Sequence, residues 1–398
     1  MVIIRVLIFK IVALDGITGE KVEKPQIYEP LYNIPVTPTE HESKMMGSQW
    51  FQRLKGMHLD NESIEKNNTA KTAAKIEGPL TLYQHSLGTF SLLARDYPKS
   101  DMLRASALLC CVGDIPFAKE IRGACENNGK GDMFEAARTD IKKEILFKTD
   151  LSEPMRRESV PPRAVYDITE GMYKSPLLSQ GNIIGADMLD FVIRRACCTG
   201  NRTAGKRATS KIDIAELVGR VKFLERGASS EDEDVARAVH GMIIKASKKA
   251  FSDKSIASSA LLQRAFEHLL EDSGAYKDAN TLKEILRNTE QEMINLLSKY
   301  NPKCNSKYAS SKINMNFKVI EFNPGEFQKD NPYEDVIHYC VRERDVEMFA
   351  KTTLTKTVSL HAIEVKEQFA PFTEMDEKAG KDILKLKDYV GTYVVSIG

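Results

Sequence analysis

The stretch ASALLCCVGDIPFAKEI, residues 105–121, carries residue types that are able to do chemistry. It begins with the small and leucine residues of a buried helix, and it then reaches Cys110, Cys111, Gly113 and Asp114 before a Pro-Phe pair. A glycine and a Pro-Phe corner after a buried helix is a place where a metallohydrolase can hold its metal ligands. The pattern therefore raises two alternatives, a metal site built with thiols or a site that has lost its ligands.

Two more residues of ligating type, His85 in YQHSLGTF and Asp187 in ADMLDF, are considered with them because of the family resemblance described below. A soft-metal site would place His85, Cys110, Asp114 and Asp187 around zinc, which accepts nitrogen, sulfur and oxygen ligands in a tetrahedron. The sequence holds no Cys-x-x-Cys motif, so the spacing by itself does not demand a metal.

Each of these residues also has a structural interpretation. Free cysteine is among the most buried residue types, which favours Cys110 and Cys111 as small packing residues. His85 is equally well explained as a core histidine whose ring nitrogens are hydrogen-bonded. Asp187 precedes an amphipathic pattern that starts at Met188, so the N-cap of a helix is the favoured position for its carboxylate.

A basic loop, NRTAGKRATSK at residues 201–211, is the candidate for phosphate binding, through Arg202, Lys206 and Arg207. The alternative is a solvated loop, which the overall charge favours. The chain has 57 Lys and Arg residues against 56 Asp and Glu residues, so electrostatic capture of bulk nucleic acid is not indicated.

The cysteines indicate a reducing environment. There are seven cysteines, an odd number, and two pairs are adjacent in sequence, where a disulfide would close a strained ring. A reducing cytoplasm is therefore expected.

The first fourteen residues are apolar but contain Arg5 and Lys10 and are too short to span a bilayer. We expect a hairpin strand there, and no membrane segment or export signal.

Helices are the elements that must position the candidate residues. Apolar spacing predicts helices over residues 39–58, 84–121, 131–148, 163–174, 186–198, 231–252, 255–272 and 279–300. After residue 312 apolar and polar residues alternate, which predicts strands. The expected fold is mainly α, with an N-terminal strand or extended segment at 1–38, a helical domain at 39–300 and a smaller mixed α/β region at 301–398.

Four segments, taken in order, resemble the HD-domain phosphohydrolases of the deoxynucleoside triphosphate triphosphohydrolase type. Residues 27–57 resemble the entry segment of that family, and YQHSLGTFSLLA resembles its first-ligand helix. ALLCCVGDIPFAKEI resembles the helix and corner that carry the His-Asp pair, and NIIGADMLDFVIRRACCTG resembles the last-ligand helix. The resemblance covers about residues 25–300 and implies an HD-domain helical fold.

The family arranges a histidine, a His-Asp pair and a final aspartate around a divalent metal that activates a bound water. The resemblance implies that His85 and Asp187 are residual metal ligands at the first and last of these positions. The His-Asp pair falls on Cys110 and Cys111, so both of those ligands are lost. The catalytic histidine of the corner falls on Asp114.

Other positions diverge as well. The next histidine of the family falls on Lys119, and the histidine of the following helix falls on Phe134, beside a retained Glu135. Three further positions that the family uses also differ, and they are Leu82, Phe191 and Arg195. The retained positions are those that hold shape, and they are Gly88, Gly113, Pro116, Phe117, Arg194 and Gly200.

The resemblance thus favours a catalytically degenerate HD-domain protein that acts in binding, regulation or structure and can keep nucleotide binding. Its vestigial pocket would consist of His85, Cys110, Cys111, Asp114, Lys119, Glu135 and Asp187. The alternative is a divergent metal-dependent nucleotide phosphohydrolase with rearranged ligands. We expect no cofactor, with Mg, Mn or Zn as the alternative, and the resemblance implies a homo-oligomer or a protein partner.

Overall fold

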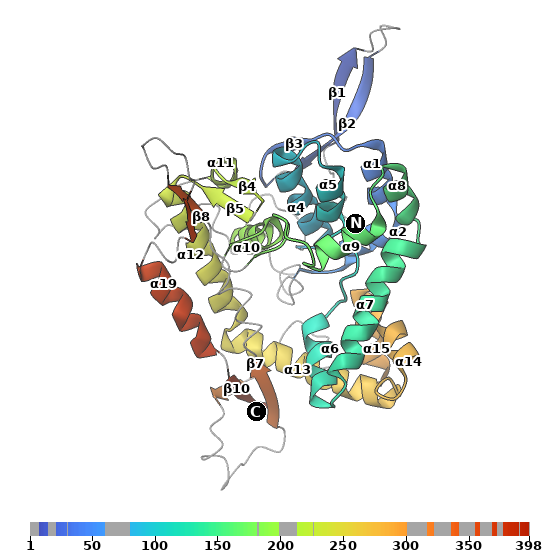
Figure 1. The fold of residues 1–398 in the computed structure, drawn as a ribbon. Coiled ribbons are helices and arrows are strands. Elements are labelled where there is room, and N and C mark those ends of the chain that lie inside the picture. The colour runs from blue at the N-terminus through green and yellow to red at the C-terminus, as the bar shows by residue number, and fades with distance from the viewer. Residues whose placement is uncertain are drawn as a thin grey trace.

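The computed structural model describes most of the helical part of the chain and the strands that flank it. The described residues are 8–14, 21–29, 31–59, 80–180, 183–198, 213–225, 227–300, 317–321, 336–341, 355–358, 368–371, 377–389 and 391–397. Helices dominate, as the sequence predicts (Figure 1). Within these ranges no helix is long and apolar enough to cross a membrane.

The first half of the helical part begins with capped helices. Thr39 starts α1 and Thr81 starts α4, each with a capping box, in which the threonine side chain and a Glu or Gln three residues later satisfy each other's backbone N–H groups. The helices up to the predicted last-ligand helix are α1 (Glu40–Gly47), α2 (Gln49–Arg53), the 3-10 helix η1 (Leu54–Gly56), α4 (Leu82–Asp96), α5 (Asp101–Leu108), α6 (Ala118–Asn127), α7 (Gly131–Lys148), α8 (Ser152–Arg157), α9 (Pro162–Thr169) and α10 (Ala186–Cys198).

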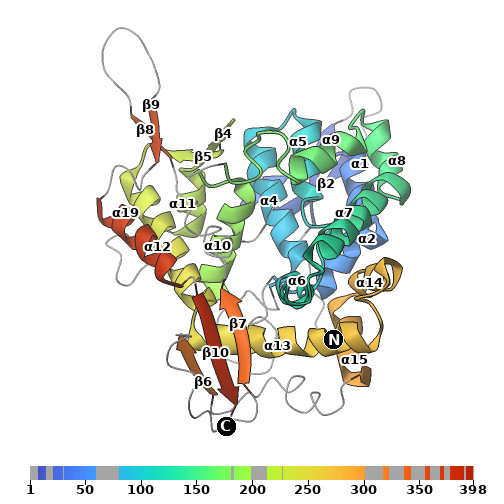
Figure 2. The same cartoon turned by 60° about the horizontal axis from the view of Figure 1, so that its bottom comes forward.

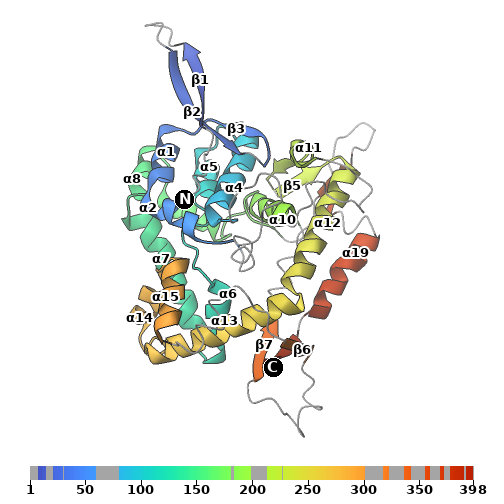
Figure 3. The ribbon, with the colours of Figure 1, turned by 180° about the vertical axis from the view of Figure 1, so that it is seen from behind.

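The second half continues with longer helices. They are α11 (Ile214–Gly219), α12 (Glu233–Ala250), α13 (Asp253–Asp272), α14 (Ala279–Leu286), α15 (Glu290–Tyr300), α19 (Glu377–Leu384) and the 3-10 helix η2 (Lys385–Tyr389). The helix α10 packs against α4 on one side and α12 on the other, and the view from behind shows the same order (Figure 3). This arrangement puts the start of α10 next to α4 and the turn after α5.

Three small sheets complete the fold. The strands β1 (Ile8–Leu14) and β2 (Lys21–Glu29) form the predicted hairpin, and β3 (Ile34–Val36) extends it. A second sheet has the order β6 (Phe317–Glu321), β10 (Gly391–Ile397) and β7 (Val336–Val341), and it lies against α13 (Figure 2). The third has the order β4 (Lys222–Leu224), β5 (Gly227–Ser230), β8 (Thr355–Val358) and β9 (Gln368–Pro371).

The third sheet ties the C-terminal region to the helical part. Its two halves meet where β5 pairs with β8 in parallel, with Ser229 opposite Thr355. The strands β8 and β9, which lie beyond residue 301, therefore extend a sheet that begins within residues 39–300. The predicted mixed α/β region is present, and it shares a sheet with the helical domain.

Three of the predicted helical stretches are broken in the structure. The stretch over 39–58 consists of α1, α2 and η1. The helical pattern over 84–121 consists of α4, α5 and α6, and Cys110 and Cys111 lie in the turn after α5, just before the predicted Pro-Phe corner. The helix predicted over 279–300 consists of α14 and α15. Thr289 separates them because its hydroxyl accepts a hydrogen bond from the backbone N–H of Glu292, while the Glu292 carboxylate accepts one from the backbone N–H of Thr289.

Candidate functional site

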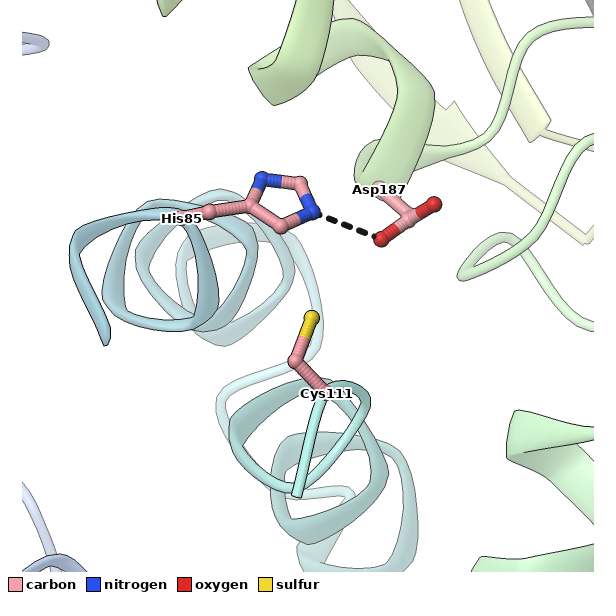
Figure 4. A group of neighbouring side chains, drawn as sticks. All are labelled: His85, Cys111 and Asp187. Atoms are coloured by element: carbon pink, nitrogen blue, oxygen red, sulfur yellow. Dashed lines mark hydrogen bonds and ion pairs between the residues drawn. The ribbon is translucent and has the colours of Figure 1, made fainter. Parts of the chain in front are cut away.

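Three side chains from distant parts of the chain meet at the junction of α4, α10 and the turn after α5. His85 comes from α4, Cys111 from the turn and Asp187 from the first turn of α10 (Figure 4). One donor atom from each residue lies within 4.8 Å of the other two. The Nε2 atom of His85 lies 2.9 Å from Oδ1 of Asp187. The structure thus brings together the two predicted residual ligands and one of the two cysteines.

His85 is held from both sides by carboxylates. Its Nδ1 atom lies 2.6 Å from Oδ2 of Asp190, while Nε2 faces Asp187. Burial opposes the charged form of the ring, but the hydrogen bonds and charges of Asp187 and Asp190 outweigh burial and hold the pKa of His85 well above its ordinary value. The two carboxylates therefore favour the protonated ring, in which both nitrogens donate.

Asp190 is the centre of the buried network behind this histidine. It is completely buried, and its Oδ2 atom accepts a hydrogen bond of 2.6 Å from Nε of Arg194, one turn along α10. The hydroxyl of Tyr32 donates to the other oxygen. Burial raises the pKa of Asp190, but the charge of Arg194 and the hydrogen bond from His85 outweigh it and lower the pKa. Glu29 on β2 lies 3.2 Å from Arg194 and brings the N-terminal segment into the network.

Gly88 allows α4 and α10 to approach closely enough for these contacts. A Cβ atom at this position would lie 1.9 Å from Oδ1 of Asp190 and 2.2 Å from Nη2 of Arg194. Both neighbours are buried and held by charges, so they cannot move aside cheaply. The glycine that the resemblance marks as a retained shape-holding position is therefore needed for contact between the two helices.

Cys110 and Cys111 are both buried, in agreement with the packing interpretation. Their sulfur atoms lie 3.5 Å apart, and Sγ of Cys110 lies 3.9 Å from the hydroxyl of Ser86. The zinc set proposed from sequence contained Cys110, whereas the structure places Cys111 in the donor group. The difference arises because the cysteines occupy a turn, where adjacent side chains point in different directions. The contact with Cys110 and burial raise the pKa of the Cys111 thiol well above its ordinary value.

Asp114 lies at the edge of the same group. Its carboxylate accepts a hydrogen bond from the Cys111 thiol, and its backbone carbonyl accepts one of 2.5 Å from Arg53. Burial raises the pKa of Asp114; the positive charge of Lys142 opposes this shift and the negative charge of Asp187 adds to it. Asp114 therefore adds a further carboxylate next to the three donors.

The predicted capping role of Asp187 is wrong. The helix α10 begins at Ala186, so Asp187 lies within its first turn rather than at the N-cap. The backbone N–H of Asp187 donates to the carbonyl of Leu177 at 3.0 Å. The carboxylate does not cap the helix and faces His85 instead. The Asp187 side chain is 33% exposed.

The remaining predicted residues lie apart from this group. Lys119 is exposed, and its ammonium lies 5.9 Å from the ring centre of Phe251. Glu135 on α7 pairs with Arg122 at 2.7 Å and with Arg138 at 3.1 Å. Neither belongs to the three-donor group. Arg202, Lys206 and Arg207 lie outside the described residues.

A second charge network, which sequence reasoning missed, joins α7 to Glu170 at the end of α9. The ammonium of Lys142 is buried and lies 2.7 Å from Oε1 of Glu170, and Nη2 of Arg138 lies 2.8 Å from Oε2 of the same residue. Gly113 permits this placement, because a Cβ atom there would lie 2.5 Å from Cγ of Lys142. The corner after α5 is thus fixed against α7 as well as against α4.

The donor set does not fit the ions of the family that the sequence resembles. Mg²⁺ takes oxygen ligands in an octahedron, and Mn²⁺ also prefers carboxylate, carbonyl and water oxygens. The group here offers one nitrogen, one sulfur and one oxygen. Where the resemblance places a histidine and an aspartate, the chain has two thiols.

Comparisons with known proteins support the fold and nothing more specific. No protein-family model matches the chain, and no curated protein matches it. The fold is similar to the crystal structure of a hypothetical protein from Aquifex aeolicus, with a TM-score of 0.62. The similarity covers 94% of this chain and 96% of that chain at 15% sequence identity, a level that indicates a shared fold only.

Proposed function

We propose that this chain is a catalytically degenerate HD-domain protein that acts by binding, as a regulatory or structural component. The observation that carries the proposal is the pair of buried thiols, Cys110 and Cys111, at the positions where the resemblance puts the metal-bridging His-Asp pair. The mainly helical fold and the meeting of His85 with Asp187 are consistent with that resemblance.

The chemistry of the pocket supports loss of hydrolysis. Metal-assisted hydrolysis needs an ion that polarises the phosphate and lowers the pKa of a bound water. A hard ion would find only His85 and Asp187 among the positions of the family's four ligands. The two replacements are thiols in a buried turn, and the raised pKa of Cys111 keeps that thiol protonated in the absence of a metal. A nucleotide that binds in this pocket would therefore stay intact.

The test is phosphate or triphosphate release from each deoxynucleoside triphosphate, with Mg²⁺ or Mn²⁺ supplied, by the full chain and by Asp187→Ala. We expect no release above the level of the Asp187→Ala variant, because the wild-type pocket lacks the ligands for either ion. Equilibrium binding of the same nucleotides, measured by calorimetry, reports whether the pocket still accepts them. Robust turnover that Asp187→Ala abolishes would establish the alternative, a divergent nucleotide phosphohydrolase.

A further inference from the structure

We propose that His85, Cys111 and Asp187 form a zinc site that ties α4, the turn after α5 and α10 together. The three donors are an imidazole nitrogen, a thiol and a carboxylate oxygen, all within 4.8 Å of one another. Zinc is the common biological ion that takes these three ligand types together in a tetrahedron. The structure thus favours zinc over the expectation that no cofactor is bound.

The residues behind His85 are arranged as they are around metal-binding histidines. Such histidines donate their second ring N–H to a carboxylate, which fixes the ring and makes the ligating nitrogen more basic. Here Nδ1 of His85 lies 2.6 Å from Asp190, whose other contacts with Arg194 and Tyr32 hold it in place. The ring is therefore oriented with Nε2 toward Asp187 and Cys111. This second observation is independent of the identity of the three donors.

Zinc binds the deprotonated forms of both ligands, so the ion would take the place of the proton on Nε2 of His85 and of the proton on the Cys111 thiol. A tetrahedron leaves one further position, and we infer that Asp114 supplies it, because its carboxylate accepts a hydrogen bond from Cys111. A site closed by protein ligands is structural rather than catalytic. The inference does not depend on whether the chain hydrolyses nucleotides.

Cys110 provides a matched control. It neighbours Cys111, is the same residue type and is also buried, but its sulfur contacts Cys111 and Ser86 and is not part of the donor group. The two variants Cys111→Ser and Cys110→Ser therefore make the same chemical change at adjacent buried positions, and only the first removes a ligand.

The experiment uses the full chain, stripped with a chelator and dialysed, and then titrated with Zn²⁺ against a chromophoric competitor. We expect one zinc per chain and a higher melting temperature with zinc than without it. Cys111→Ser should weaken zinc binding by about 100-fold or more, since even outer-shell changes cost about 10- to 100-fold, whereas Cys110→Ser should leave affinity within about threefold. Replacing zinc with Co²⁺ should give a sulfur-to-metal charge-transfer band in wild type and Cys110→Ser but not in Cys111→Ser.

Folding of each variant is checked by circular dichroism. If Cys111→Ser fails to fold, Asp187→Asn replaces it as the ligand variant. The Asp187 side chain is 33% exposed, so its substitution damages the core less. Absence of zinc binding by the wild-type chain, or an equal loss of affinity in the Cys110→Ser and Cys111→Ser variants, would overturn the proposal. If the chain binds zinc and also hydrolyses nucleotides, the zinc site stands and the proposed non-catalytic function is wrong.

Discussion

The Nδ1 atom of His85 lies 2.6 Å from Oδ2 of Asp190, and this contact joins α4 to α10 through two charges that are hidden from water. Asp190 also accepts a hydrogen bond from Arg194, so this one carboxylate contacts two buried cations. Removing one member of such a network is costly because the others are left charged and unpaired.

Asp190→Asn should therefore lower the free energy of unfolding by about 3–5 kcal/mol. The matched control is Asp187→Asn, which also removes a carboxylate next to His85 but at a side chain that is 33% exposed. There we expect a loss of at most about 1 kcal/mol in metal-free protein, because the partly exposed Asp187 pairs more weakly and Asp190 still contacts the ring. Urea unfolding at pH 7 with a chelator present measures both. Equal losses in the two variants would contradict the central role of Asp190.

Gly88→Ala should destabilise the chain by about 1–3 kcal/mol or more, because the new Cβ atom would overlap the carboxylate of Asp190. Gly241 on α12 is also a helical glycine, but it is exposed and a Cβ atom there would meet nothing within 4 Å. Gly241→Ala should thus stabilise by about 0.5–1 kcal/mol through better helix propensity. Thermal and urea unfolding of the two variants compares them, and a stable Gly88→Ala would show that the helices can separate without loss.

Glu170 should make the chain sensitive to acid. Burial opposes ionisation of this residue, but the hydrogen bond from Arg138 and the charge of Lys142 outweigh burial and lower the pKa of Glu170 from its ordinary value of 4.5. A carboxylate whose pKa is lower in the folded state contributes stability above its unfolded pKa, and that stability is lost as the pH falls through the folded pKa.

The pH dependence can be assigned with one variant. Glu170→Gln should be less stable than wild type at pH 7, and the difference between the two should shrink as the pH falls below about 4.5. Urea unfolding from pH 7 to pH 3 provides the comparison. A difference that stays constant over this range would assign the acid sensitivity to other carboxylates.

The buried thiols should resist alkylation in the native protein. Cys110, Cys111 and Cys125 are buried, and burial raises the pKa of Cys125 to about 12. Thiolates are the reactive species, so these residues should react slowly, while the half-buried Cys197 should react before these three. Mass spectrometry of peptides after timed iodoacetamide treatment reports the order. Labelling of Cys111 before Cys197 would mean that the turn after α5 opens readily.

Regular apolar spacing predicts the bounds of some helices but not the breaks between others. The helices α7 and α10 have the predicted bounds, because one apolar face runs through each of them without a break. The break between α14 and α15 also has a local signal, the Thr289–Glu292 capping pair, which apolar spacing alone does not register. The turn that separates α5 from α6 has a local signal in its Pro-Phe corner, where Phe117 adopts a positive φ of 56°.

The candidate site was predictable in part. The positions of His85 and Asp187 in the resembling segments were enough to expect that they meet. Which cysteine faces them depends on the geometry of a turn, and apolar spacing says nothing about that. The contribution of Tyr32 and Glu29 depends on a contact between residues more than a hundred positions apart, and no local pattern encodes such a contact.

The parallel pairing of β5 with β8 has a consequence for synthesis of the chain on the ribosome. Ser229 emerges long before its partner Thr355, so the backbone groups along that edge of β5 have no strand to pair with in the meantime. An exposed strand edge is a template for association with other chains, and domains made early in translation can fold before later strands arrive. The nascent protein is therefore exposed to aggregation, and can need a chaperone, in the interval between these two strands.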